Sequence, residues 1–252
     1  MKREIIFKID GSLDGILTAV YETFSKKLNQ QNVDLRCQTD LIKQNLFSET
    51  IIIEKNSQKA SKVLKKLKFL LNNGNYNRLF IAVKSGRENA CQIIFSYILK
   101  IIKENKDVSD NFNDESVFLY NKMINAILLE SHRFKGFLRF SKLENGVYYA
   151  KYSPDNDVTE LITPHFVKRF FNMPFIIHDE KRGVLSAHAS GKTVYKNSNV
   201  KALNVKDEFS NLFKTYCDAV FIKQRKNTRL MLNYMPKRYH KNTPEKDELL
   251  NC

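Results

Sequence analysis

The sequence lacks tryptophan and is poor in the residues that mark special classes of protein. Its 252 residues include no Trp, 8 Gly, 5 Pro and 4 Cys. So little glycine and proline excludes a collagen-like or low-complexity chain. Hydrophobic residues make up 42% of the sequence, which is too many for a disordered chain. At roughly 100–200 residues per domain, the length allows one large domain or two small ones.

Clustered metal ligands are also missing. The four cysteines, Cys37, Cys91, Cys217 and Cys252, are scattered, and no CxxC pair occurs. This spacing argues against a structural zinc site or an iron–sulfur cluster formed by this chain alone. The histidines form no HxxxH or HExxH pattern. We therefore expect neither a metal nor another cofactor.

Long hydrophobic runs are absent as well. No stretch approaches the roughly 18–20 apolar residues of a membrane span. Lys8 and Asp10 interrupt the apolar stretch near the N-terminus, so it does not resemble a secretory signal. These observations predict a cytoplasmic protein that has no membrane partner.

Common catalytic motifs do not occur in the sequence. There is no GxxxxGK[ST], GxGxxG or GxSxG, so whether the protein is an enzyme stays open. The one candidate for acid–base chemistry is His178 beside Asp179 at the mouth of an expected hairpin, with Arg182 as an anion binder. The alternative is ordinary turn chemistry, because Asp favours turn starts.

Positive charge is the feature in excess. Lys and Arg number 42 against 27 Asp and Glu, which gives a net charge of +15. Residues 129–252 hold 22 basic and 13 acidic residues, and residues 1–128 hold 20 and 14. Such an excess indicates an anionic partner, of which DNA is the first candidate, RNA an alternative and an anionic membrane surface a weaker one.

The densest positive segment runs from Lys223 to Lys241 and contains no acidic residue. Its cations could neutralise phosphates, and its amide and aromatic side chains could add hydrogen bonds or stacking. The alternative is a solvated helix end. The candidate nucleic-acid contacts here are Arg225, Lys226, Asn227, Arg229, Lys237, Arg238 and Tyr239.

A second basic segment alternates cations with aromatics from His132 to Phe140. We expect a strand at its end, over 137–140, which would place Arg133, Lys135 and Arg139 on one face for nucleic-acid contact. The alternative is an edge strand whose charges only prevent aggregation.

The overall pattern predicts an α+β fold. The first half reads as mostly helical with one or two strands, and the second half as two β-hairpins alternating with helices. We expect a helix over 205–224 as well. The polar, acidic stretch 104–114 is the best linker candidate. It suggests an N-terminal helical α+β region over 1–110 and a C-terminal α+β region with a basic tail over 111–252.

Four segments together resemble an uncharacterised bacterial family assigned to DNA repair or DNA metabolism. They are Ile9–Phe24, Glu130–Phe140, His165–Gly183 and Ile222–Glu245. The resemblance implies a radical-SAM iron–sulfur partner with a role in DNA modification or repair. A similar domain is fused to some uracil-DNA-glycosylase-like proteins. It implies no catalytic residue, because no reaction is established for the domain.

Three functions therefore stand as hypotheses. The first is a nucleic-acid-binding accessory subunit of the radical-SAM partner. The second is a nucleic-acid-processing enzyme that uses His178 and Asp179. The third is a protein-interaction subunit that does not bind DNA.

Overall fold

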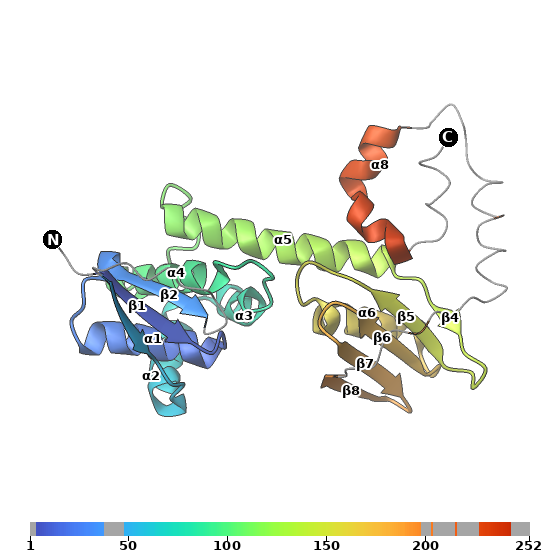
Figure 1. Cartoon of the computed structure of the whole chain (residues 1–252), viewed down its shortest axis with the longest axis horizontal. Coiled ribbons are helices and arrows are strands. Elements are labelled where there is room, and N and C mark those ends of the chain that lie inside the picture. Colours follow the sequence, from blue (N-terminus) through green and yellow to red (C-terminus); the bar gives the residue numbers. More distant parts are fainter. Residues whose placement is uncertain (1–3, 38–47, 198–202, 204–214, 216–226, 243–252) are drawn as a thin grey trace. The chain divides into compact units, whose positions relative to one another are not determined.

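A computed structural model describes residues 4–37, 48–197, 203, 215 and 227–242 (Figure 1). The chain divides into two compact units, unit 1 (Met1–Ile127) and unit 2 (Leu128–Cys252). Each unit contains a β-sheet and helices, so the mixed α and β composition predicted from the sequence is confirmed. The division falls within α5 (Glu115–Phe137), which supplies residues to both units.

Unit 1 is built on a three-stranded parallel sheet with the order β2-β1-β3. The predicted strand β1 (Glu4–Ile9) lies at the centre and buries Phe7 and Ile9 completely. A turn with Gly11 at φ 79° leads into α1 (Leu13–Ser25), and the Ser12 side chain caps that helix by accepting from the Gly15 N–H.

The two outer strands of this sheet are β2 (Val33–Cys37) and β3 (Ser48–Ile52). The sequence predicts one or two strands in the first half, and the structure has three. Strand β2 was missed, because its five residues alternate polar and apolar over too short a length to stand out.

Helices complete unit 1. They are α2 (Ser57–Leu70), α3 (Asn73–Ala82) and α4 (Ala90–Glu104), and α1 packs against both α2 and α4. The sequence of 76–83 suits either a strand or a helix, and the structure makes it helical as far as Ala82. The polar stretch expected as a linker packs on unit 1, since the Ser109 hydroxyl lies 2.7 Å from the buried Tyr97 hydroxyl.

The strand expected at 137–140 is wrong. Helix α5 continues to Phe137, and the Leu138 N–H still donates to the Phe134 carbonyl at 3.1 Å. The alternation of cations and aromatics also satisfies a helical period, because Phe134 and Leu138 are four residues apart and both are buried.

Unit 2 contains a five-stranded sheet with the order β4-β5-β6-β7-β8. Helix α6 (Thr159–Phe170) connects the parallel neighbours β5 and β6. The other neighbours are antiparallel. The predicted hairpin of β6 with β7 is present. A hairpin also ends in β5, but its first strand is β4 at 141–142 and not the expected stretch 137–140. The strands are β4 (Ser141–Lys142), β5 (Tyr148–Tyr152), β6 (Phe175–Asp179), β7 (Val184–Ala189) and β8 (Lys192–Asn197).

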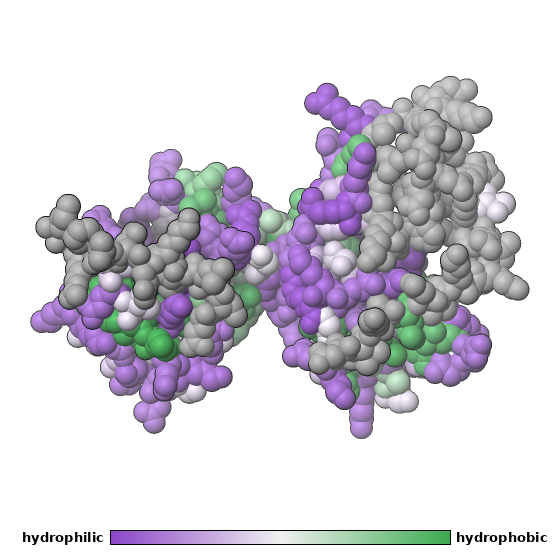
Figure 2. Space-filling model, viewed as in Figure 1, coloured by the Kyte–Doolittle hydropathy of each residue, from purple (hydrophilic) through white to green (hydrophobic). Residues whose placement is uncertain are grey.

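Two short helical segments end the described part of unit 2. They are α8 (Thr228–Tyr234) and the 3-10 helix η3 (Lys237–Asn242). The helix expected over 205–224 lies outside the described residues. Among the residues that Figure 2 colours, hydrophilic ones predominate on the visible face, and apolar patches lie between them on both units. Among the described residues, no helix is both long enough and apolar enough to cross a membrane.

Candidate nucleic-acid interface

The interior of unit 2 is organised around the carboxylate of Glu130, which is only 3% exposed and lies on α5. The backbone N–H groups of Asp155 and Asn156 donate to its two oxygens at 2.7 and 2.8 Å. The Asn156 side-chain amide donates at 2.6 Å and the Tyr239 hydroxyl at 2.7 Å. A buried carboxylate is tolerated only when donors surround it, so these four bonds fix α5, the loop after β5 and η3 together.

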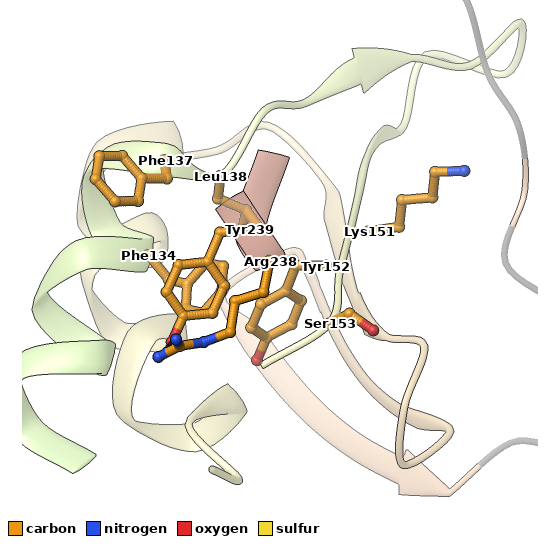
Figure 3. A pocket seen from close by; sticks show the side chains of 8 residues that line it. All are labelled: Phe134, Phe137, Leu138, Lys151, Tyr152, Ser153, Arg238 and Tyr239. Carbon is orange, nitrogen blue, oxygen red and sulfur yellow. Dashed lines mark hydrogen bonds between the residues drawn. The ribbon is translucent and has the colours of Figure 1, made fainter. Parts of the chain in front are cut away.

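The ring of Tyr239 packs against other aromatic rings of unit 2 (Figure 3). The ring lies 4.9 Å from that of Phe134, which in turn lies 4.9 Å from that of Tyr152, both in edge-on contacts. Burial, followed by the hydrogen bond to Glu130 and the charge of that residue, raises the pKa of Tyr239. Because Tyr239 is 5% exposed, its ring has no free face for stacking on a base.

Arg238 is also engaged within unit 2. Its Nε lies 2.7 Å from the Asp155 carboxylate, and its guanidinium lies 4.8 Å from the Tyr239 ring centroid. The ion pair is about half exposed on both sides, so it orients the side chain more than it stabilises the fold. Arg238 still offers part of its surface to solvent.

The candidate acid–base pair is buried. His178 is 3% exposed and its Nδ1 lies 2.8 Å from the Tyr149 hydroxyl. Asp179 is fully buried, accepts from the Lys181 and Arg182 N–H groups and forms an ion pair with the Arg182 guanidinium at 3.0 Å. Burial lowers the pKa of His178 and raises that of Asp179, the latter against the effect of Arg182. This is the geometry of a structural turn.

Arg182 links that turn to the loop after β5. Its guanidinium donates to the Pro154 carbonyl at 3.1 Å and also to the Asp155 carbonyl. The loop at 154–156 is thus bonded to Glu130, to Arg182 and to Arg238, which come from three separate segments. These segments therefore converge, but the side chains that bring them together are bonded to one another within the protein.

The remaining predicted residues of the C-terminal run and of α5 differ in their surroundings. Arg133 donates to the Asn233 carbonyl at 2.8 Å, and the Asn227 side chain caps α8 by accepting from the Leu230 N–H. Arg229 and Lys237 are exposed. Arg225 and Lys226 lie outside the described residues.

A cationic face forms where α5 ends beside α6. We use this name for Lys135, His165, Lys168 and Arg169. The Phe140 ring, just after α5, lies 5.0 and 4.6 Å from the Phe166 and Phe170 rings of α6, which holds the two helix ends together. Lys168 and Arg169 follow His165 by three and four residues and so share its side of α6.

The positive charges of this face act on His165. Partial burial, then the nearby charges of Lys135 and Arg169, lower the pKa of His165. Arg139 donates to the Gly136 carbonyl at 2.8 Å, which holds its guanidinium at the end of α5. Cations from two helices thus lie near one another, and grouped cations of this kind can contact phosphates.

Three members of this face were missed from the sequence. His165, Lys168 and Arg169 lie in a segment noted only for its resemblance, although their i, i+3, i+4 spacing was a readable signal. The group formed by Glu130, Asp155 and Asn156 carried no such signal, because the bonds within it join distant parts of the chain. Within the described ranges, no cluster of three His, Cys, Asp or Glu side chains could hold a metal ion.

Comparison with known proteins finds similarity to a solved structure and a match to a family. The solved structure is a DHH domain described as a member of the s1p family of ribosomal proteins. It is 9% identical, with a TM-score of 0.30 over 75% of this chain and 74% of that one. At this score the likeness does not establish a shared fold. No curated protein matches the chain.

The family match covers residues 88–245, which is more than half of the sequence. This range includes Glu130 with its hydrogen-bond partners and the whole cationic face. The matching profile is DUF4130, a domain of unknown function. The chain therefore belongs to the DUF4130 family.

Proposed function

We propose that the protein is a DNA-binding accessory protein of DNA repair or DNA metabolism, which holds DNA for a radical-SAM partner. The observation that carries the proposal is the cationic face. The Phe140 ring, just after α5, packs on Phe166 and Phe170 of α6, and the last turns of these two helices carry Lys135, Lys168 and Arg169. Phosphate contacts from grouped Lys and Arg side chains account for most nonspecific affinity for DNA.

The charge of the whole chain supports the same partner. The net charge of +15 favours approach to a polyanion over long range. In the C-terminal basic run, Arg229 and Lys237 are exposed and add to the positive surface of unit 2. The resemblance to a DNA-repair family and its radical-SAM partner agrees with this assignment.

An accessory role fits better than catalysis by His178 and Asp179. Both side chains are buried, and both are bound to neighbours within unit 2. We therefore assign the chemistry to the partner and expect the purified protein to leave DNA unchanged. Activity in the absence of any partner, lost in His178→Ala with the fold intact, would instead support the enzyme hypothesis.

Salt-dependent DNA binding tests the proposal. Each phosphate neutralised on duplex DNA contributes about 0.9 to the slope of log Kd against log salt. The double variant Lys135→Glu/Arg169→Glu should weaken binding and lower the slope by about 1.8.

The matched control is Lys65→Glu/Lys68→Glu, which makes the same change of charge at two exposed positions of α2 in unit 1. Its effect on the slope should be clearly smaller. Equal losses in the two double variants would show that net charge alone drives binding. Failure of the unaltered protein to bind DNA at low salt would leave the protein-interaction hypothesis.

A further inference from the structure

One aromatic side chain stands out at the end of α6. Phe171, the residue that follows the helix, is 76% exposed. Its backbone has φ 52° and ψ −106°, a conformation that side chains other than glycine rarely adopt. Strain of this kind persists only where the surrounding structure imposes it, and it is concentrated at functional positions.

The surroundings of Phe171 are firmly anchored on both sides. Phe170 packs into an aromatic cluster, with its ring 4.6 Å from Phe140 and 5.4 Å from Phe175. The Phe171 N–H donates to the Val167 carbonyl at 3.2 Å, and the Met173 N–H donates to the Phe170 carbonyl at 2.9 Å. Strand β6 begins directly afterwards. The backbone that carries the exposed ring is therefore held in place on both sides.

The chemistry around the ring selects one class of ligand. Lys168 and Arg169 of the cationic face precede it in the last turn of α6, and Met173, 44% exposed, follows it. An apolar partner alone would not require these cations, whereas a nucleotide offers both a flat base to stack on and a phosphate to neutralise. An unpaired base is needed, because bases inside a duplex already stack on one another.

We propose that Phe171 stacks on an unpaired base of single-stranded DNA whose phosphates contact the cationic face. The proposal rests on the DNA-binding function above and adds a preference for single strands. It also predicts two independent contributions to binding. The positive charges set the affinity for any DNA, and Phe171 sets the preference for single strands.

Unit 1 supplies a matched comparison. Phe69 is 84% exposed and has the Lys66 ammonium 6.0 Å from its ring centroid. It lies within the regular helix α2 and does not have the positive φ of Phe171. A general benefit of exposed aromatics beside lysines would appear at both positions.

The first experiment measures Kd for an oligothymidine and for a duplex of equal length, with the full chain. Phe171→Ala should weaken binding to the single strand roughly fivefold or more, the effect of losing one stacked base. Its duplex affinity should be unchanged. Phe69→Ala should alter neither value.

The second experiment uses the absence of tryptophan from the chain. Phe171→Trp introduces a single tryptophan, whose fluorescence should be quenched when oligothymidine stacks on it. Polyphosphate, which offers charge without bases, should bind without quenching. Phe69→Trp should not be quenched by either polymer.

The outcomes separate this proposal from the one on which it rests. Unchanged single-strand affinity in Phe171→Ala, or equal losses at Phe69 and Phe171, would overturn the stacking role and leave DNA binding intact. An absence of binding to either form of DNA at low salt would overturn both proposals. Loss of single-strand affinity alone, together with quenching at position 171, is the result expected.

Discussion

Both units bury apolar side chains, and they differ in the hydrogen-bonded polar network that unit 2 adds to its core. In unit 1, strand β1 and helix α1 bury apolar side chains such as Phe7, Ile9, Ile16 and Leu17 completely. In unit 2, a carboxylate with four hydrogen-bond donors is buried between α5, the loop after β5 and η3. Apolar burial is non-directional and tolerates adjustment, whereas a buried polar network is stable only when every member is satisfied.

The largest effect expected from this difference is at Glu130. Glu130→Ala leaves four donors without their acceptor in the interior of unit 2, and we expect a loss of about 3 kcal/mol or more in the free energy of unfolding. Glu144→Ala, in the exposed turn of the β4–β5 hairpin, is the control and should change stability by less than about 0.5 kcal/mol.

Hydrogen exchange gives a local measure of the same change. The amides of Asp155 and Asn156 donate directly to Glu130, so their exchange should accelerate in Glu130→Gln, while amides of β1 in unit 1 should keep their rates. Unaltered exchange at both amides would show that the network does not hold the loop.

The next effect compares two Tyr→Phe changes, one in each unit. The Tyr239 hydroxyl donates to Glu130, so Tyr239→Phe should cost about 1–3 kcal/mol. The Tyr120 hydroxyl in unit 1 is buried without a hydrogen-bond partner, and its ring stacks on Tyr97 at 3.7 Å. Removing that hydroxyl should leave stability unchanged or raise it by up to about 1 kcal/mol. Urea denaturation would measure the free energy of unfolding of the two variants. Similar losses in both would show that the hydrogen bond to Glu130 does not distinguish the two tyrosines.

The smallest effect expected is a pair of Phe→Gly changes with opposite signs. Phe171→Gly relieves a residue at positive φ and should raise unfolding free energy by roughly 1 kcal/mol. Phe69→Gly places glycine in regular helix and should lower it by roughly 0.5–1 kcal/mol. Thermal melts of the two variants would shift in opposite directions. A lower melting temperature for Phe171→Gly would mean that the ring stabilises unit 2 more than its backbone strains it.

Much of the fold follows from local patterns. Strand β1, helix α1 and the β6–β7 hairpin were predictable because each combines a clear period with a capping or turn residue. The stretch 137–140 was not, because alternating cations and aromatics satisfy the periods of both a strand and a helix. In the structure the helix continues to Phe137, and it buries Phe134 against Tyr152 and Tyr239.

The candidate site was less predictable than the fold. Arg238 lies in a run without acids and reads as a free cation, yet Asp155, far earlier in the chain, binds it. Tyr239 bonds to Glu130 across 109 positions. Local sequence carries no record of such long-range pairs. The sequence therefore predicts a positive surface. It does not predict which cations bond within the protein and which face the solvent.

The continuity of α5 has a consequence for how the chain folds. This 23-residue helix runs across the boundary between the units, and helices shorter than about 12–15 residues are marginal in isolation. Neither unit alone therefore retains a segment of α5 long enough to stay helical without tertiary support. Each part of α5 therefore depends on packing within its own unit, as Tyr120 packs on Tyr97 in unit 1 and Phe134 packs on Tyr152 and Tyr239 in unit 2.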